Sequence, residues 1–234
     1  MFFNYRLIMK SKKHLFEKNV FDVNKDIILV DLSYMIFYRF FAIRNWYKKA
    51  YPDKDLPDDY DWLQDEIFMT KYKKLFFNKL FDICKQRNIH ISNVIFVIDC
   101  KNSTIWRHNE QKLYKATRQE SHKKSKFYSY KIFSVVIDNL LPDFLNKYSA
   151  HMIKYPECEA DDVIANLVFS INELNGSNGS NESINRKIYI VGTDSDYIQI
   201  CNDNVILLNL CNIELNHKYL DNYVQNTHYL IMKC

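Results

Sequence analysis

The chain has 234 residues, of which 47% are hydrophobic and 26% are charged. This composition is typical of folded globular proteins and excludes disorder as the general state. The length allows one large domain or two small ones, with about 70% of the unfolded chain's surface buried on folding. Only three glycines are present, at positions 176, 179 and 192. Neither a P-loop nor a GxGxxG nucleotide-binding loop can be formed from them.

The net charge of +4 is distributed unevenly along the chain. Residues 101–131 contain nine Lys or Arg and two Glu, a net charge of +7, which leaves −3 for the rest of the chain. Residues 53–66 contain seven acids and one lysine. A basic segment on an otherwise acidic chain indicates a polyanionic partner that binds at one place, and a solvated helix face is the alternative explanation. For the acidic segment we expect a solvated loop.

The cysteines and the N-terminal residues indicate whether a zinc site is expected and in which cellular compartment the protein works. None of the six cysteines forms a CxxC pair and no histidine has zinc-ligand spacing, so we expect no zinc site. Charges interrupt the apolar residues of the N-terminus, unlike in a signal peptide, and no apolar run approaches the roughly 18 residues of a membrane span. We expect an intracellular protein, cytoplasmic or nuclear, with free thiols and no membrane partner.

Short apolar runs bounded by polar residues predict buried strands. In chain order we expect strands at 26–31, 93–99, 187–191 and 204–209, with a short extended piece at 151–155. Apolar residues at helical spacing predict helices. These helices are expected at 33–46, about 62–88, 131–147 and 159–174. Ser33 is expected to cap the first helix. The alternation of strands and helices predicts an α/β fold whose mainly parallel sheet carries helices on both faces.

Acidic side chains follow three of the predicted strands and open one predicted helix. In parallel sheets, sites lie at the carboxyl ends of the strands. An extended geometry would point Asp194 and Asp196 the same way, and Glu159 and Asp162, three residues apart, would share a helix face. The seven acids expected at this edge are Asp31, Asp99, Glu159, Asp161, Asp162, Asp194 and Asp196.

Each acidic group alone has an ordinary explanation as a helix cap, a charge at a helix N-terminus or a turn. Seven converging negative charges, however, are strongly unfavourable without counter-cations. Carboxylate oxygens suit Mg²⁺ or Mn²⁺ better than zinc. The sequence therefore predicts a site for two divalent ions that act on a phosphate.

Four blocks of the sequence resemble blocks of the 5′→3′ exonuclease family. This family includes the 5′-nuclease domain of bacterial DNA polymerase I, phage 5′ exonucleases and, more distantly, flap endonucleases. The blocks are IILVDLSYMIFYRFFA, VIDCKNSTIWRHNEQKLYKATR, ECEADDVIANLV and IYIVGTDSDYIQI, in the family's order. The resemblance implies a PIN-like 5′-nuclease fold in a single catalytic domain, 1–234. It also implies a basic helical arch at about 101–130, and the segment 175–185 is expected to be a flexible loop.

The resemblance also implies an activity and assigns residues to it. The protein would be a metal-dependent, structure-selective nuclease that hydrolyses phosphodiester bonds near 5′ ends, with the seven acids holding two Mg²⁺ ions that Mn²⁺ can replace. Lys115 and Arg118 match the basic pair at the base of the family's arch and would contact the scissile phosphate. Arg107 and Tyr114 are further candidates in the same block. The expected partners are DNA flaps, 5′ ends and RNA primers, together with a replication protein, and the protein is expected to be a monomer.

The resemblance ends where family members continue into a helix–turn–helix element that grips duplex DNA. We expect this element to be absent from the chain. The alternative function is then a catalytically incomplete nucleic-acid-binding subunit that needs a partner or a longer chain. A PIN-like ribonuclease would share the sheet and the acids, but the Tyr-Lys-x-x-Arg block and the long basic segment argue against it. A phosphoaspartyl phosphatase would need Asp-x-Asp after the first strand, which this chain lacks.

Overall fold

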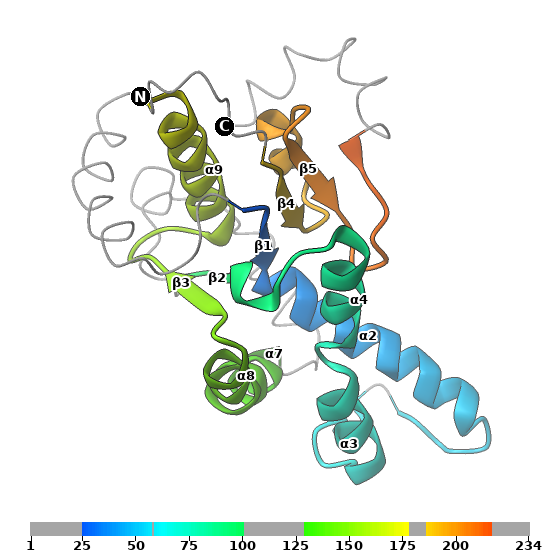
Figure 1. Ribbon diagram of the computed structural model, residues 1–234. Helices are drawn as coiled ribbons and strands as arrows, with labels where there is room; N and C mark the ends of the chain where they lie inside the picture. The colour runs from blue at the N-terminus through cyan, green and yellow to red at the C-terminus, as the bar shows by residue number, and fades with distance from the viewer. Residues whose placement is uncertain (1–24, 58, 101–128, 178–185, 217–234) are drawn as a thin grey trace.

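A five-stranded sheet, parallel throughout, lies at the centre of the molecule (Figure 1). The computed structural model describes residues 25–57, 59–100, 129–177 and 186–216. The strands are β1 (Ile27–Asp31), β2 (Val94–Ile98), β3 (His151–Lys154), β4 (Ile188–Val191) and β5 (Val205–Leu208). Their order across the sheet is β3-β2-β1-β4-β5, so β1 is central. The predicted α/β class and parallel sheet are confirmed.

Helices connect the strands and cover both faces of the sheet. The α-helices are α2 (Leu32–Ala50), α3 (Glu66–Leu75), α4 (Asn78–Arg87), α7 (Ser129–Ser134), α8 (Leu141–Tyr148) and α9 (Ala160–Ser177). The shorter turns are the 3₁₀-helices η1 (Ile91–Asn93) and η4 (Ser195–Ile200) and the π-helical η3 (Val135–Leu140).

The strands are buried on both faces because alternate residues feed two separate apolar clusters. Ile28 and Val30 of β1 pack in a large cluster with α2, α3, α4 and α8. Ile27 and Leu29 pack in a second cluster with α9 and η4. Successive side chains of a strand point to opposite faces, so helices on both sides require continuous apolar strands. In Figure 1, α9 accordingly lies apart from α2, α3 and α4.

The predicted single helix at about 62–88 is wrong, because α3 and α4 are separate helices joined at Phe76 and Phe77. Phe76 is fully buried, and the ring of Phe77 stacks on Phe144 of α8 with centroids 4.0 Å apart. The buried guanidinium of Arg39 donates to the Leu75 carbonyl over 2.8 Å. A cation at the last carbonyl of a helix complements its dipole, and here it fixes the end of α3.

Two other predicted helices differ at their edges. The helix expected at 131–147 runs from α7 through η3 to α8, and Pro142 stands at the start of α8. Proline cannot donate the usual helical hydrogen bond, which suits a change of hydrogen-bonding pattern at this point. The helix expected at 159–174 continues to residue 177, so the first three residues of the predicted loop are helical. Residues 178–185 of that loop lie outside the described part of the chain.

The described residues of the acidic segment form a loop up to Asp65, as predicted, with Glu66 opening α3, but one of the acids is not solvated. The carboxylate of Asp65 is 5% exposed and accepts hydrogen bonds from Tyr47, Tyr60, Lys54 and the backbone N–H of Phe68. These donors hold the pKa of Asp65 well below its ordinary value. Asp65 therefore caps α3 and ties the loop to α2, while the other described acids of the loop are exposed.

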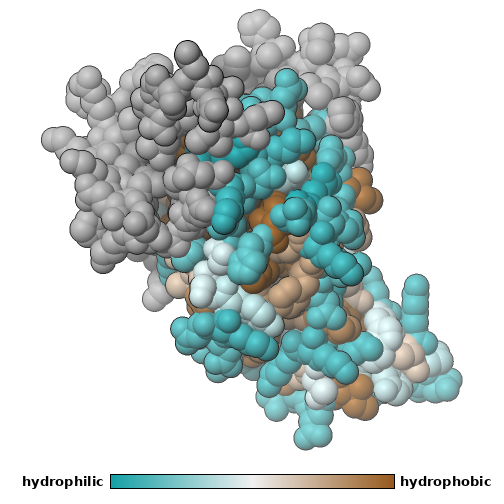
Figure 2. Space-filling view, in the orientation of Figure 1, coloured by the Kyte–Doolittle hydropathy of each residue, from teal (hydrophilic) through white to brown (hydrophobic). Residues whose placement is uncertain are grey.

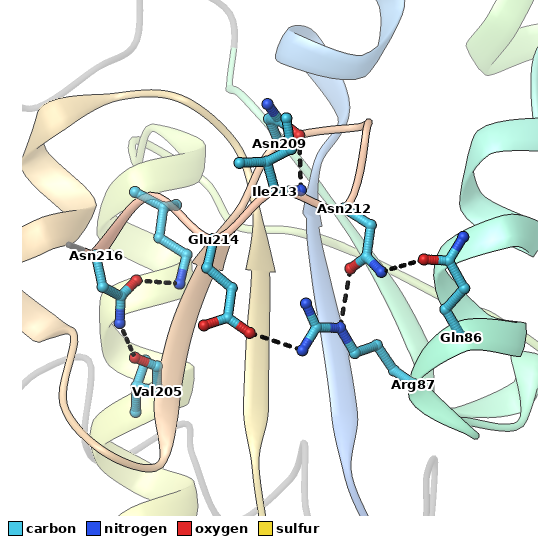
Figure 3. A network of polar contacts seen from close by, with 9 residues as sticks. Gln86, Arg87, Val205, Asn209, Asn212, Ile213, Glu214 and Asn216 are labelled. Atoms are coloured by element: carbon cyan, nitrogen blue, oxygen red, sulfur yellow. Dashed lines mark hydrogen bonds and ion pairs between the residues drawn. The ribbon is translucent and has the colours of Figure 1, made fainter. Parts of the chain in front are cut away.

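The segment after β5 is held against α4 by a polar network, seen in Figure 3. Arg87, at the C-terminus of α4, donates to Asn212 over 2.9 Å and to Glu214 over 2.8 Å. Asn212 in turn donates to Gln86. Asn212 has a φ of 60°, a left-handed conformation that asparagine tolerates better than most residues. This network fixes the path of residues 209–216.

In the view of Figure 2 the described surface is largely hydrophilic, with hydrophobic patches between hydrophilic residues. No helix within the described residues is long and apolar enough to cross a membrane.

Candidate metal centre

The carboxyl edge of the central strands carries the first two predicted acids. Asp31 is the last residue of β1, and Asp99 directly follows β2, its neighbour in the sheet. Asp194 comes shortly after β4, which flanks β1 on the other side. The parallel register brings these three positions to one edge, as the strand pattern predicts.

Asp31 is held by donors from two elements. Its Oδ1 accepts from the backbone N–H of Tyr34 over 3.0 Å, which makes Asp31 the N-cap of α2. The expectation that Ser33 caps this helix is therefore wrong. Oδ2 of Asp31 accepts from the Tyr197 hydroxyl, also over 3.0 Å. Burial nevertheless raises the pKa of Asp31 to about 6, and the negative charges of Asp99 and Asp194 add to this rise.

Asp99 joins β2 to two helices. Oδ2 of Asp99 accepts from the hydroxyl of Ser33 over 2.5 Å, and Oδ1 accepts from the backbone N–H of Ala160 over 2.8 Å. Ala160 is the first residue of α9. The Asp99 carboxylate therefore lies at the N-terminal end of α9, where the exposed N–H groups and the helix dipole favour a negative charge.

A compact acidic group forms at this same helix end. Carboxylate oxygens of Glu159, Asp161 and Asp162 lie within 4.8 Å of one another. Glu159 is only 6% exposed, and its backbone N–H donates to Asp162 over 3.3 Å. The N–H of Asp162 donates to Asp161 over 2.8 Å. Three carboxylates this close, one of them buried, provide the oxygen-only donor set that hard divalent cations prefer.

Tyr197 lies close to acids of the sheet edge and of α9. Its pKa is raised well above the ordinary value, first by burial and then by the charges of Asp31, Asp161 and Asp99. These interactions place the tyrosine close to acids from three elements. Neither Tyr197 nor the Ser33 contact to Asp99 was expected from the sequence. The available signal for Tyr197 was its position: it is an aromatic residue that directly follows the polar residues 193–196, which contain the Asp-x-Asp pair.

The expected extended geometry of Asp194 and Asp196 is wrong. Asp194 is the N-cap of η4, and its side chain accepts from the backbone N–H of Asp196 over 3.1 Å. The chain therefore turns between the two residues, and Asp196 lies exposed on the first turn of the 3₁₀-helix. The charge of Asp194 contributes to the raised pKa of Asp31, which places Asp194 near the sheet edge.

The four residues proposed to act on the phosphate lie outside the described residues. These are Arg107, Tyr114, Lys115 and Arg118, all within 101–128. Their roles therefore stay predictions, as does the arch that would carry them. The seven acids likewise stay predicted ligands. The structure brings Asp31 and Asp99 to the sheet edge beside the start of α9, where Glu159, Asp161 and Asp162 lie close together, and it places Asp196 on the exposed first turn of η4.

Comparison with protein families assigns most of the chain. Residues 26–228 match the family model described as 5′-3′ exonuclease, N-terminal resolvase-like domain. Because the match covers well over half of the sequence, the chain belongs to the 5′-3′ exonuclease family, and its fold is the resolvase-like 5′-nuclease fold. A comparison with curated protein sequences gave no match.

Solved structures from bacteriophage T5 share this fold. One is a T5 protein co-crystallised with metal ions, with a TM-score of 0.52, 17% identity, and coverage of 83% of this chain and 59% of that one. A T5 5′-exonuclease with bound zinc gives a TM-score of 0.50 at 16% identity, covering 87% of this chain and 61% of that one. A T5 flap endonuclease, a pseudo-enzyme–product complex with DNA and metal ions, gives 0.52 at 15% identity with the same coverage. The chain spans about six tenths of the length of these structures.

Proposed function

We propose that this chain is a divalent-metal-dependent, structure-selective nuclease that hydrolyses phosphodiester bonds near 5′ ends of DNA. The observation that carries the proposal is the connected set of acids at the carboxyl edge of the sheet. Glu159, Asp161 and Asp162 provide a carboxylate cluster at the start of α9, and Asp99 links that helix end to the edge where Asp31 lies. Loss of hydration and the charges of Asp99 and Asp194 raise the pKa of Asp31, and a bound divalent cation would offset this crowding of negative charge.

The donor set fits Mg²⁺ or Mn²⁺, and the proposal assigns two such ions. When bound, they would activate a water molecule and stabilise the leaving oxygen. The chain's own part is to hold the carboxylates in place: the N-termini of α2 and α9 orient Asp31 and Asp99 through backbone N–H groups. Lys115 and Arg118 are proposed to contact the scissile phosphate, with Arg107 and Tyr114 in supporting positions.

The proposed substrates are DNA flaps, 5′ ends and RNA primers, which are intermediates of DNA replication and repair. The net charge of +7 over residues 101–131 supports a polyanionic substrate. The related T5 flap endonuclease was solved with DNA and metal ions, which also supports this class. A catalytically incomplete nucleic-acid-binding subunit is the alternative that the experiment must separate.

Cleavage of a 5′-labelled DNA flap tests the proposal. The 234-residue chain is assayed with Mg²⁺, with Mn²⁺ and with chelator, beside Asp161→Asn and the control Asp203→Asn. Asp203 is exposed and precedes β5, at the opposite end of the strands from the acids. We expect metal-dependent product from the unchanged chain and from the control. Asp161→Asn should cleave at a rate at least about 100-fold lower, because loss of a metal ligand should cost more than loss of a residue that only orients a ligand.

DNA binding by Asp161→Asn should be intact or stronger, because a charge that repels phosphate is removed. Equal cleavage by Asp161→Asn would contradict the metal-site assignment. A folded chain that binds metal and DNA but yields no product would favour the incomplete-subunit alternative.

A further inference from the structure

Tyr197 is a buried polar group at the acidic edge. It lies on η4, is 2% exposed, and packs in the apolar cluster beneath α9. Its hydroxyl donates to Oδ2 of Asp31 over 3.0 Å. A buried tyrosine hydroxyl needs a hydrogen-bond partner, and here the partner is the carboxylate at the end of the central strand.

The tyrosine completes a two-sided hold on that carboxylate. Oδ1 of Asp31 accepts from the backbone N–H of Tyr34 on α2, and Oδ2 accepts from Tyr197 on η4. With one donor on each oxygen, the carboxylate plane is fixed by two elements that follow different strands. Each carboxylate oxygen can accept more than one partner, so this hold leaves capacity for a cation.

The local backbone is shaped around the tyrosine ring. Gly192 is the residue directly after β4, and a Cβ added there would come within 2.8 Å of Cε2 and 3.3 Å of Cδ2 of Tyr197. The same Cβ would lie 3.7 Å from the Cβ of Asp31. The ring therefore occupies the space that any other side chain at position 192 would fill. This packing and the hydrogen bond are separate observations: the first places the ring beside Gly192, and the second places the hydroxyl at Asp31.

We propose that Tyr197 is a positioning residue, which orients the Asp31 carboxylate for a divalent cation, and that Gly192 provides the space for its ring. The inference rests on the proposed metal-dependent function and goes beyond it by assigning an outer partner to one ligand. Outer partners that orient a ligand typically change metal affinity by about 10-fold to 100-fold when they are removed.

Binding of Mn²⁺ to the metal-free protein, followed by calorimetry or by the free-ion EPR signal, tests this role without reference to cleavage. Tyr197→Phe removes only the hydroxyl, and we expect its Kd for Mn²⁺ to rise about tenfold. Tyr72→Phe is the matched control, because Tyr72 is equally buried but its hydroxyl donates to the Ile36 carbonyl over 3.5 Å in the other apolar cluster. The control should bind Mn²⁺ as the unchanged chain does.

A double-mutant cycle separates positioning from a general loss of packing. Gly192→Ala retains the hydroxyl but its Cβ would clash with the Tyr197 ring, so we expect the ring to shift, the hydrogen bond to Asp31 to be disturbed and Mn²⁺ binding to weaken in the unchanged background. In the Tyr197→Phe background the same alanine should change the Kd for Mn²⁺ little, because no hydroxyl is left to displace. If Tyr197→Phe fails to fold, Gly192→Ala alone carries the test, because that variant retains the Tyr197 hydroxyl and disturbs only its position.

The outcomes distinguish this inference from the proposed function. Unchanged Mn²⁺ affinity in both Tyr197→Phe and Gly192→Ala, with cleavage by the unchanged chain, would overturn the positioning role and leave the nuclease. Weakened affinity in these variants from a chain that cleaves no flap would support the positioning role and contradict the nuclease. An unchanged chain without measurable Mn²⁺ binding would overturn both.

Discussion

Replacing Asp31 with asparagine should stabilise the metal-free protein at neutral pH and reduce its response to divalent cations. Asp31 is partly buried at the end of β1, and loss of hydration followed by the charges of Asp99 and Asp194 raises its pKa to about 6. Asparagine keeps an oxygen that can accept from the Tyr34 N–H, and it is a good N-cap for α2. The substitution therefore removes the unfavourable charge while keeping the cap.

The size of the effect follows from the pKa. A rise from the ordinary value of 3.8 to about 6, at about 1.36 kcal/mol per pH unit, corresponds to about 3 kcal/mol. The folded state binds this proton more tightly than the unfolded state does. The resulting stability is fully present below pH 3.8 and is lost as the pH rises through about 6. Asp31→Asn should thus gain about 3 kcal/mol at pH 7.5, and the gain should fall toward zero near pH 4.

Urea unfolding in the presence of chelator measures this difference at pH 7.5, 6 and 4, with Asp203→Asn as the exposed control. A gain of the same size at every pH would show that the charge of Asp31 is not its source. No gain at pH 7.5 would refute the argument outright. With Mn²⁺ added, the free energy of unfolding of the unchanged chain should rise, because the ion binds the folded state. It should rise less for Asp31→Asn, which lacks one of the proposed ligands.

Two further substitutions test contacts away from the metal centre. Asp65→Asn should lower the free energy of unfolding by about 3 kcal/mol relative to the exposed control Asp55→Asn, because a buried carboxylate loses its charge-assisted bonds. Because the pKa of Asp65 is lowered in the folded state, this loss of stability should be present at neutral pH and should shrink as the pH falls below the ordinary carboxyl pKa toward the folded one. A loss of stability that stays constant down to pH 2 would contradict this reasoning. Arg87→Ala should release residues 209–216, and their amides should exchange faster by a factor equivalent to about 1–2 kcal/mol. If the amides of residues 209–216 exchange no faster in Arg87→Ala than in the exposed control Lys85→Ala, Arg87 does not hold this segment in place.

The positions of the strands and of their terminal acids could be predicted from the sequence because both depend on local pattern. Continuous apolar runs such as those before Asp31 and Asp99 are needed wherever a parallel strand is covered on both faces. The acids at their ends then share an edge for purely topological reasons. The acidic opening of α9 was predictable for the same kind of reason, since acids in the first turn complement the helix dipole.

The details that the sequence did not predict depend on contacts between distant elements. The end of α3 at Leu75 is set by Arg39, which lies 36 positions earlier in the chain. The turn between Asp194 and Asp196 forms where Tyr197 is drawn into the apolar cluster beneath α9, and an Asp-x-Asp pair alone does not distinguish this turn from an extended strand. Local periodicity carries no information about such pairings, because each is decided by burial in the folded chain.

The acidic edge raises the question of how a fold tolerates so many like charges before any cation is present. Part of the answer is the placement of carboxylates at helix starts. Asp31 caps α2, Asp194 caps η4, and Asp99 accepts from the first N–H of α9. Backbone N–H groups thus offset some of the repulsion at each position. The offset is incomplete at Asp31, whose pKa stays near 6 despite two donors. The residual unfavourable charge is concentrated on Asp31, at the end of the central strand β1, and this is where a bound divalent cation would stabilise the fold most.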